Sequence, residues 1–301
     1  MILPNKYIET ILKILGKKGK EWLNNIDSII EKNAELYNLS EIKPVNNLTY
    51  NLVMTAISKE YGEVIVKIGL PDRETIQEIT TLKYFNVNFA CKCYASDFND
   101  LFYVLEKLKP GTDLLKVKEK DKRINIFCEL AQNLPVICTE SVDLPTYRKT
   151  LDIAFDKARN NKDEYCKIID LVEIADNIYS EIESLNLNKY ILHGDLHHTN
   201  ILLDNNTYKA IDPHGRIGEK ILELGVFIKN ELMIYGDSKK EIEETINVIA
   251  KKINENEIMI AKVTFIILVL SCCWNIEDNN QEYIDREIQI YRKILKLYNL
   301  T

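Results

Sequence analysis

The sequence lacks the features of a secreted or membrane-bound protein. Its seven cysteines include no Cys-x-x-Cys pair, so we expect reduced, mostly buried thiols and no disulfide framework. The first twenty residues carry several charges and no long apolar run, so we expect no signal peptide. The longest apolar stretch, Val263–Trp274, is too short to span a bilayer and predicts a buried helix. We therefore expect a cytoplasmic protein with no membrane partner.

The chain also lacks the positive charge of a nucleic-acid binder. Its formal net charge is -7, and 46% of its residues are hydrophobic and 28% charged, as in an ordinary globular protein. A negative surface repels phosphate backbones, so we expect no nucleic-acid partner, whereas a small cationic ligand would suit it. No repeat or low-complexity linker interrupts the 301 residues, which can form one large core or two lobes.

Histidine is scarce, and its four copies all fall between His193 and His214. Within this region Asp195 and Asn200 stand five residues apart, and Asp212 ends a short apolar run. This spacing is typical of a kinase catalytic loop, in which one carboxylate orients and deprotonates a hydroxyl while an amide and a second carboxylate hold Mg²⁺. We therefore predict Asp195 as the catalytic base and Asn200 and Asp212 as Mg²⁺ ligands.

The same region admits two plainer interpretations. His193 and His197 are spaced like a pair of zinc ligands, but no cysteine or further histidine completes a zinc set. The histidines are then scaffold, with His193 bonded to backbone and His197 and His198 packed in or near the loop. Asp and Asn are also common turn residues when they occur singly. Here the apolar strands Tyr190–Leu192 and Ile201–Leu203 bracket the loop, which favours the functional interpretation.

The chain before Pro110-Gly111 alternates between helix and strand patterns. Apolar residues at helical spacing predict two N-terminal helices, and alternation around the Tyr61-Gly62 turn predicts a hairpin. A further helix and two strands follow. The predicted ranges are 5–15 and 21–36 for the first helices, 48–58 and 63–68 for the hairpin, 73–85 for the third helix, and 92–96 and 101–105 for the last strands.

After Pro110-Gly111 the pattern is mostly helical, and only the catalytic segment adds short strands. Predicted helices cover 124–136, 146–160, 164–185, 220–235, 241–252, 257–274 and 282–297. This order predicts an α+β, protein-kinase-like fold with two lobes and ATP between them. We assign 1–105 to a small nucleotide-binding lobe with an antiparallel sheet and helix. Residues 106–111 form the predicted hinge, and 112–301 a larger helical lobe with the catalytic loop and acceptor site.

The small lobe carries a candidate phosphate anchor. Lys67 lies at the end of an apolar strand, where a kinase needs one cation for the α- and β-phosphates and a carboxylate on the next helix to position it. Glu74 and Glu78 are the candidates for that carboxylate. We favour Glu78, because it lies among apolar residues of the helix, whereas Glu74 lies in the first turn and suits the helix dipole. The plainer interpretation makes Lys67 a solvated strand end.

Glycine is missing from the loop that would cover the phosphates, Asn46-Asn-Leu-Thr-Tyr-Asn51. Backbone amides and the Thr49 hydroxyl can replace a glycine-rich loop, because phosphate requires only N–H and O–H donors. The segment Val104–Leu108 is the candidate for adenine binding. Backbone groups at Glu106 and Leu108 would read the base edge while apolar side chains enclose the ring.

Together these residues resemble the aminoglycoside phosphotransferase family, and in particular its streptomycin 6-kinase and hydroxyurea-resistance kinase branch. The resemblance spans about residues 20–280 and is carried by Trp22-Leu23, Val66–Gly69, Leu105–Gly111, His193–Leu202, Ile211–Pro213, Gly215, Gly218 and Trp274–Asp278. It implies a protein-kinase-like fold, ATP or sometimes GTP, Mg²⁺, and phosphorylation of a small-molecule hydroxyl. It also implies antibiotic resistance by O-phosphorylation, with the base, metal ligands and phosphate anchor named above.

The chain departs from this family where Glu219-Lys-Ile-Leu-Glu223 replaces an Asp-Pro-x-x-Asp pattern. Glu223 can still accept hydrogen bonds from the catalytic loop, although its extra methylene changes its reach. We therefore predict that His193 and Glu223 support the loop.

The acceptor is the open part of the prediction. If it is streptomycin, its guanidinium groups need carboxylates, and Glu277 and Asp278 supply two beside the aromatic face of Trp274. The plainer interpretation makes these residues a helix end. A kinase for another small alcohol, amino alcohol or hydroxyurea-like compound is the main alternative. A nucleotide-binding pseudokinase is the other, favoured by the glycine-free loop and disfavoured by retention of the predicted catalytic residues.

Overall fold

The computed structural model describes residues 2–46 and 48–300. The chain divides into two compact units, Met1–Gly111 and Thr112–Thr301. The division comes directly after the segment 106–111, which the sequence pattern marks as a hinge. Both units mix helices with antiparallel strands, so the fold class is α+β.

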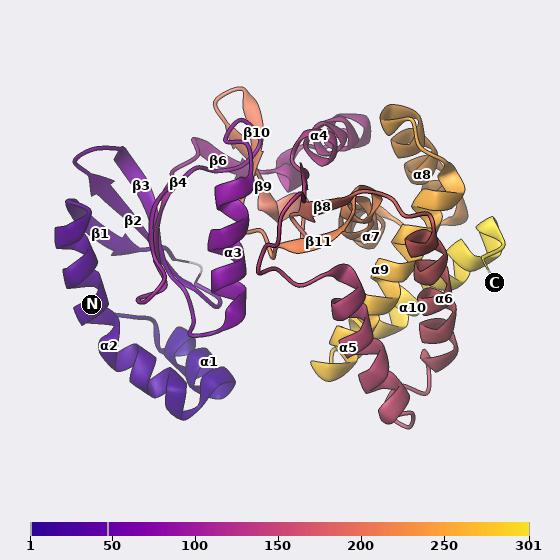
Figure 1. The fold of residues 1–301 in the computed structure, drawn as a ribbon, viewed down its shortest axis with the longest axis horizontal. Helices are drawn as coiled ribbons and strands as arrows, with labels where there is room; N and C mark the ends of the chain where they lie inside the picture. The colour runs from indigo at the N-terminus through magenta and orange to yellow at the C-terminus, as the bar shows by residue number, and fades with distance from the viewer. Residues whose placement is uncertain (1, 47, 301) are drawn as a thin grey trace. The chain divides into compact units, whose positions relative to one another are not determined.

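The first unit combines one sheet with helices on either side (Figure 1). Its five strands are antiparallel in the order β1-β2-β3-β5-β4. Its elements are α1 (Asn5–Leu15), α2 (Lys17–Leu36), β1 (Leu39–Pro44), β2 (Leu52–Ser58), β3 (Gly62–Ile68), α3 (Arg73–Tyr84), β4 (Cys93–Asp97) and β5 (Phe102–Glu106).

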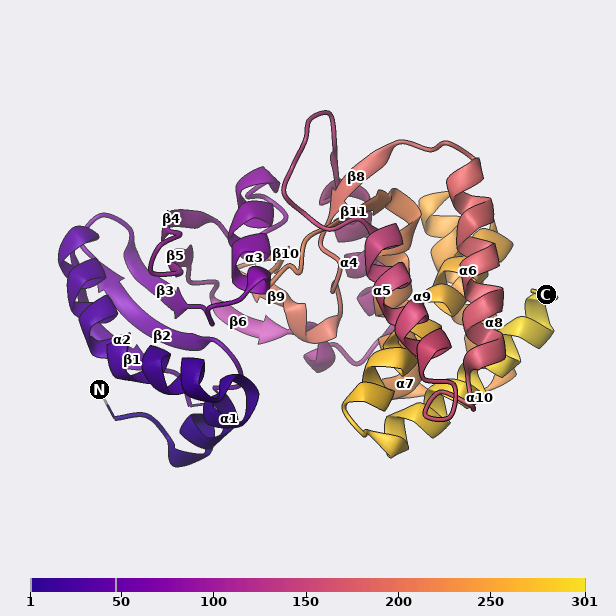
Figure 2. The same ribbon diagram turned by 60° about the horizontal axis from the view of Figure 1, so that its bottom comes forward.

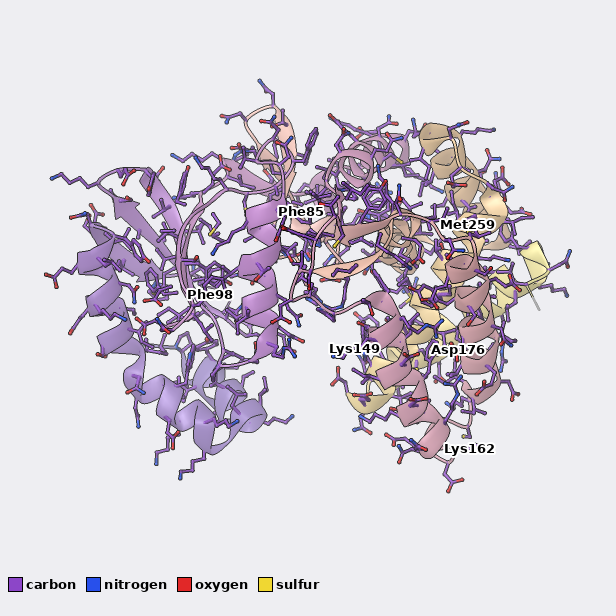
Figure 3. The ribbon with its side chains drawn as sticks, viewed as in Figure 1. Phe85, Phe98, Lys149, Lys162, Asp176 and Met259 are labelled. Atoms are coloured by element: carbon purple, nitrogen blue, oxygen red, sulfur yellow. The ribbon has the colours of Figure 1, made fainter. Side chains whose placement is uncertain are left out.

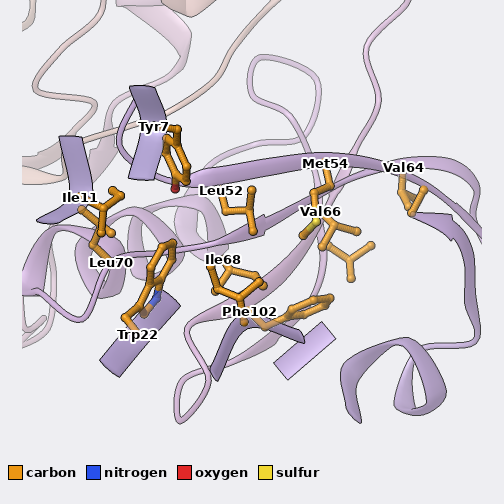
Figure 4. Close-up of a cluster of buried hydrophobic side chains, with 13 residues drawn as sticks. Tyr7, Ile11, Trp22, Leu52, Met54, Val64, Val66, Ile68, Leu70 and Phe102 are labelled. Atoms are coloured by element: carbon orange, nitrogen blue, oxygen red, sulfur yellow. The ribbon is translucent and has the colours of Figure 1, made fainter. Parts of the chain in front are cut away.

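Strand alternation divides the side chains of this sheet between its two faces. One face packs against α1 and α2 in a buried apolar cluster (Figure 4). The cluster includes Tyr7, Ile11, Trp22, Ile26, Leu52, Met54, Val64, Val66, Ile68 and Phe102. The residues between them in sequence, Lys67 and Tyr103, therefore lie on the opposite face, where they contact Glu78 of α3. One strand thus contributes both to the core and to the candidate phosphate site.

The second unit is mostly helical, with two small three-stranded sheets in the orders β10-β9-β6 and β11-β8-β7. Its strands are β6 (Pro110–Asp113), β7 (Val136–Ile137), β8 (Lys189–Leu192), β9 (Ile201–Asp204), β10 (Thr207–Ala210) and β11 (Arg216–Glu219). Its helices are η1 (Leu114–Lys116), α4 (Lys120–Asn133), α5 (Tyr147–Asn160), α6 (Ile169–Ser184), η2 (His198–Asn200), η3 (Lys220–Leu222), α7 (Glu223–Tyr235), α8 (Lys239–Ile253), α9 (Glu257–Glu277) and α10 (Gln281–Tyr298), where η marks a single 3-10 turn.

Helix α9 forms the core of the second unit. It packs against α5, α6, α7, α8 and α10 (Figure 2). By length and composition it could cross a membrane, yet 72% of its apolar window is buried within the protein. This burial is what the sequence predicts for a core helix that includes Val263–Trp274.

The structure corrects several predicted boundaries. The second helix begins at Lys17 instead of Glu21, and β2 begins at Leu52 instead of Leu48. Helix α6 begins at Ile169 instead of Glu164, because turns occupy residues 161–168 after Asn161 ends α5. The strands β1, β6, β7 and β11 were not predicted; β7, for example, has only two residues, too few to show an apolar alternation. All seven cysteines are free, and four of them are buried.

Candidate active site

Lys67 and Glu78 form a buried ion pair in the first unit. The Nζ of Lys67 lies 2.7 Å from Oε1 of Glu78, and the hydroxyl of Tyr103 donates to Oε2 of the same carboxylate at 2.7 Å. The Lys67 ammonium also lies 5.4 Å from the centre of the Tyr103 ring. A buried cation is tolerated only with a partner, so β3 and α3 together fix the position of this ammonium. Glu74, the alternative carboxylate, lies in the first turn of α3.

The candidate phosphate loop connects β1 to β2, and residue 47 within it lies outside the described residues. Thr49 is exposed in this loop. Its ends are held by two hydrogen bonds: the N–H of Val45 donates to the carbonyl of Val53 at 3.0 Å, and the Tyr7 hydroxyl donates to the carbonyl of Tyr50 at 2.8 Å. None of the described loop residues has a positive φ, so their backbone conformation does not require glycine.

Glu106 and Leu108, the predicted adenine-binding positions, differ in how their groups are used. The N–H of Glu106 donates to the carbonyl of Lys92 at 2.8 Å, and its carboxylate accepts from the Lys92 N–H at 3.2 Å. The Glu106 N–H is therefore committed to the sheet. Leu108 is buried and supplies apolar surface.

His193 fixes the backbone of the catalytic loop, which follows β8. Its Nδ1 accepts from the N–H of Asp195 at 3.2 Å, so Nε2 carries the proton and donates to the carbonyl of Ile211 at 2.8 Å. Burial lowers the pKa of His193 to about 4, which keeps the ring neutral and preserves this tautomer. His193 thereby links the turn at Asp195 to the segment that leads to Asp212.

Asp195 is surrounded by hydrogen-bond donors. The Nδ2 of Asn200 donates to its Oδ2 at 3.1 Å and to its backbone carbonyl at 3.0 Å. The Nε2 atoms of His197 and His214 lie 3.3 and 3.7 Å from the same Oδ2. Burial raises the pKa of Asp195, but the hydrogen bond from His197 and the nearby rings of His214 and His193 outweigh this and leave the pKa below its usual value. Asp195 is therefore ionised at neutral pH.

Asn200 and Asp212 are brought together by backbone pairing. Ala210 lies opposite Ile201 in the register of β9 and β10, and the N–H of Ile211 donates to the carbonyl of Asn200 at 2.9 Å. Because Nδ2 of Asn200 is bound to Asp195, its Oδ1 lies at the other end of the amide. Asp212 has a φ of 55°, a left-handed conformation that Asp tolerates better than most residues. The sequence carries no signal for this conformation.

Glu223, the first residue of α7, binds the backbone of the catalytic loop. Its two carboxylate oxygens accept from the backbone N–H groups of His193 at 2.6 Å and Gly194 at 3.2 Å. Burial, together with the charge of Asp195, raises the pKa of Glu223 to about 7 in spite of these two donors. Its extra methylene relative to aspartate therefore does not prevent contact with the loop. Gly194 has a φ of 77°, and a side chain there would collide with Arg216.

A buried triad that the sequence analysis did not identify contacts the other end of the loop. Glu231 of α7 accepts from Arg123 of α4 at Nε (3.1 Å) and Nη2 (2.5 Å), and from Nε2 of His198 at 2.7 Å. The second Nη of Arg123 donates to two backbone carbonyls that precede α4. His198 stacks on Phe227 with 4.4 Å between ring centres. Since His198 opens the turn that ends at Asn200, the triad fixes that turn.

One signal could have identified Glu231. It lies four residues after Phe227 and eight after Glu223, so all three share the buried face of α7. A charged residue on an apolar helix face needs a partner. The partner itself was not predictable, because Arg123 lies 108 residues away.

The predicted acceptor residues lie at the exposed C-terminal end of α9. Trp274 is 43% exposed, and Glu277 and Asp278 are exposed as well. Glu277 already has a cationic partner, Nζ of Lys157 at 2.9 Å, and the hydroxyl of Tyr165 lies 3.5 Å from its carboxylate. The structure therefore gives this segment one carboxylate that is already neutralised and an accessible indole ring.

Asn200 and Asp212 offer oxygen ligands of the kind that Mg²⁺ prefers. Among residues 2–46 and 48–300, no group of three His, Cys, Asp or Glu side chains has the arrangement of a metal centre. Mg²⁺ bound with a nucleotide needs only one or two protein oxygens, because phosphate and water supply the others. The Asn200 amide and the Asp212 carboxylate, joined through the Ile211 N–H, match that requirement.

Comparison with known proteins assigns this constellation to a family. A family model described as aminoglycoside/hydroxyurea antibiotic resistance kinase matches residues 45–279. The chain belongs to this family. Streptomycin 6-kinase of Streptomyces glaucescens is 20% identical over 287 residues, with 92% of each chain covered.

Solved structures show the same fold at low identity. Choline kinase LicA from Streptococcus pneumoniae superposes with a TM-score of 0.63 at 14% identity, covering 91% of this chain and 100% of that one. A mutant of aminoglycoside phosphotransferase APH(4)-Ia, in complex with AMP-PNP and hygromycin B, gives 0.62 at 8% identity, covering 89% and 98%. The fold is therefore protein-kinase-like, as the sequence predicts. With the family match, this makes the chain a phosphotransferase with an alcohol group as acceptor.

Proposed function

We propose that this protein transfers the γ-phosphoryl group of ATP to a hydroxyl of a small cationic molecule, with aminoglycosides such as streptomycin as the first candidates. The observation that supports this most directly is the carboxylate of Asp195, ionised and bonded to Asn200, which is itself joined to the Asp212 segment. We further propose that the protein acts in the cytoplasm, where ATP and Mg²⁺ are available.

In the proposed reaction Asp195 accepts a hydrogen bond from the acceptor hydroxyl and takes its proton. The acceptor oxygen bonds to the γ-phosphorus as the bond from that phosphorus to the β-bridging oxygen breaks, and ADP leaves. Lys67, held by Glu78 at 2.7 Å, would neutralise charge on the α- and β-phosphates. When bound, Mg²⁺ would supply further positive charge on the phosphates, held by Asn200 and Asp212.

Adenine nucleotide is the proposed donor. The APH(4)-Ia structure that shares this fold was solved with AMP-PNP, which supports ATP over GTP. Glu106, Leu108, Thr49 and the loop of residues 46–51 are the proposed contacts for base and phosphates. The N–H and carbonyl groups near Leu108 can read adenine, while Leu108 itself is buried and apolar.

A kinase for a small amino alcohol is the second candidate. The supporting observations are the fold shared with choline kinase LicA, at a TM-score of 0.63, and the exposed indole of Trp274. An aromatic face attracts quaternary ammonium as well as guanidinium cations. The paired state of Glu277 weakens the case for a guanidinium clamp and leaves this alternative open.

A screen of ATP consumption tests the proposal. Purified protein is supplied with ATP, Mg²⁺ and one acceptor at a time from streptomycin, other aminoglycosides, hydroxyurea, choline and ethanolamine, and each product is weighed by mass spectrometry. We expect one phosphate added to a streptomycin-like acceptor, and no product with Asp195→Asn on the same time scale. Phosphorylation of choline alone would replace the first candidate with the second. ATP consumption without any phosphorylated product would overturn both.

A further inference from the structure

The N-terminal helices α1 and α2 hydrogen-bond to the backbone of the first unit at two points. The Tyr7 hydroxyl donates to the carbonyl of Tyr50 at 2.8 Å, and the indole N–H of Trp22 donates to the carbonyl of Gly69 at 3.0 Å. Tyr7 and Trp22 are 3% and 7% exposed, so both donors belong to side chains that are packed in the core. Both helices precede residues 45–279, the part of the chain that the family model matches.

The two contact points are also joined to each other. Oδ1 of Asn51 accepts from the N–H of Leu70 at 3.3 Å, which connects the residue after Tyr50 to the residue after Gly69. Lys67 lies two residues before Gly69, at the end of β3. Three hydrogen bonds at neighbouring residues therefore connect the helices, the end of the loop and the segment that follows β3, and Lys67, the candidate phosphate anchor, lies on that strand.

The hydrogen bond from Tyr7 to Tyr50 matters because the loop beside Tyr50 lacks glycine. A glycine-rich loop adapts to phosphate groups through its conformational freedom. The loop of residues 46–51 contains no glycine, and its described residues have no positive φ, so contacts from outside the loop can set the position of their amides. Preorganisation of this kind lowers the entropy lost on binding. The buried phenol of Tyr7 is the side chain that reaches the loop from α1.

We infer that Tyr7 is a positioning residue for nucleotide binding: its hydroxyl holds the glycine-free loop in the shape that receives the phosphates of a nucleoside triphosphate. The inference rests on the proposed function only in taking the loop as a phosphate contact. The hydrogen bond from Tyr7 to Tyr50 belongs to the first unit alone and can be tested without any acceptor.

The test compares Tyr7→Phe with a matched control, Tyr37→Phe. Each variant loses one phenolic hydroxyl at the same sheet, but Tyr37 stacks on Phe102 with 5.9 Å between ring centres and does not reach the loop. The Kd of AMP-PNP is measured by calorimetry, with kcat and the KM values for ATP and acceptor. One neutral hydrogen bond corresponds to about a two- to tenfold change. We expect Tyr7→Phe to weaken AMP-PNP by that factor and to raise the KM for ATP, with the acceptor KM and kcat unchanged.

Amide hydrogen exchange of residues 48–53 gives a second readout that needs no activity. We expect faster exchange in Tyr7→Phe than in Tyr37→Phe or the wild type. Unchanged exchange would show that the Tyr7 hydroxyl does not hold the loop. Faster exchange without a change in the AMP-PNP Kd would show that Tyr7 has no role in nucleotide binding. A wild-type protein that binds no AMP-PNP would instead remove the proposed function, and exchange would still report whether Tyr7 holds the loop.

Discussion

The first unit buries the charged pair Lys67 and Glu78 and otherwise fixes its functional backbone with neutral donors, Tyr7 and Trp22. In the second unit, the described residues include many more buried ionisable side chains, several of which contact the catalytic loop. The buried acidic, basic and histidine side chains of the second unit are Arg123, His193, His198, Glu219, Glu223, Glu231 and Glu287. A neutral hydrogen bond contributes the same at every pH, whereas a buried carboxylate or imidazole does not.

The contrast follows from what each unit has to hold. The proposed phosphate loop would present backbone groups to an anion, and a nearby fixed carboxylate would repel that anion. In the loop after β8, the backbone N–H groups of His193 and Gly194 both donate to the carboxylate of Glu223. Carboxylates are the strongest acceptors for such donors. The second unit therefore gains a rigid loop but makes its order depend on pH and on intact charge pairs.

The largest expected effect is on kcat in Asp195→Asn, and it tests whether Asp195 has a catalytic or a structural role. Asp195→Asn keeps the shape of the side chain and removes the base, so kcat should fall by roughly a hundred- to ten-thousand-fold. The urea midpoint and the Kd of AMP-PNP should stay near their wild-type values, because His193 and Glu223 bind the loop through backbone atoms. A large loss of stability in this variant would show that Asp195 is part of the support.

The next effect tests the buried triad. Arg123→Met leaves the carboxylate of Glu231 buried without its main partner, which should cost about 3–5 kcal/mol in the free energy of unfolding. Arg159→Met is the matched control, because Arg159 pairs with Glu173 and Asp176 and these side chains remain partly exposed; Figure 3 labels Asp176. Exposed pairs contribute only about 0–1 kcal/mol. Urea unfolding measures both, and equal losses would show that the triad is no more important than a surface network.

Sequence reasoning succeeded where the signal is local. Asp195, Asn200 and Asp212 are bracketed by short strands, and the β9–β10 register joins two of them as the spacing suggests. The structure also pairs Lys67 with Glu78, the carboxylate that the apolar pattern of the helix favours over Glu74. Local spacing carries this information because strand and turn geometry act over a few residues.

The parts that sequence reasoning missed depend on distant pairs. Arg123 and Glu231 are 108 residues apart, and Tyr7 and Tyr50 are 43 apart. No periodicity links such positions, since their contact exists only after the helices pack. The acceptor segment at Trp274 illustrates the converse. Its residue types suggested a cation pocket, but the sequence did not show that Lys157 lies against Glu277.

The pH dependence of the unfolding free energy should reveal the lowered pKa of the buried His193. Its pKa falls from 6.5 to about 4 in the folded protein, so between these values the unfolded chain binds a proton that the folded chain does not. Stability from this group is complete above pH 6.5 and is lost as the pH falls toward 4, by about 3 kcal/mol in total. Urea unfolding from pH 8 to pH 4 should therefore show a smaller decline for His193→Gln than for the wild type. Parallel curves would contradict the assigned burial.

Glu223 should contribute with the opposite sign. Its pKa rises from 4.5 to about 7 on folding, so the folded chain binds the extra proton, and the associated stability is complete below pH 4.5 and is lost as the pH rises through 7. Glu223→Gln removes this titrating group. As the pH rises from 4.5 to 7, the unfolding free energy of the wild type should therefore fall relative to that of the variant. If the difference stayed constant from pH 4.5 to 8, the carboxylate would be ionised throughout and its two N–H donors would dominate over burial.

The smallest effect is expected at the end of α9, where the charges are exposed. Glu277→Gln with Asp278→Asn should raise the KM for a cationic acceptor only about two- to fivefold, since exposed ion pairs contribute little, and the increase should shrink in high salt. Lys157→Gln is the informative companion. It frees the Glu277 carboxylate from its 2.9 Å partner, so the KM for the same acceptor should fall, while the KM for ATP stays constant in both variants. If none of these three substitutions altered the acceptor KM, the acceptor would bind elsewhere on the second unit, and Trp274 would be an ordinary exposed helix residue.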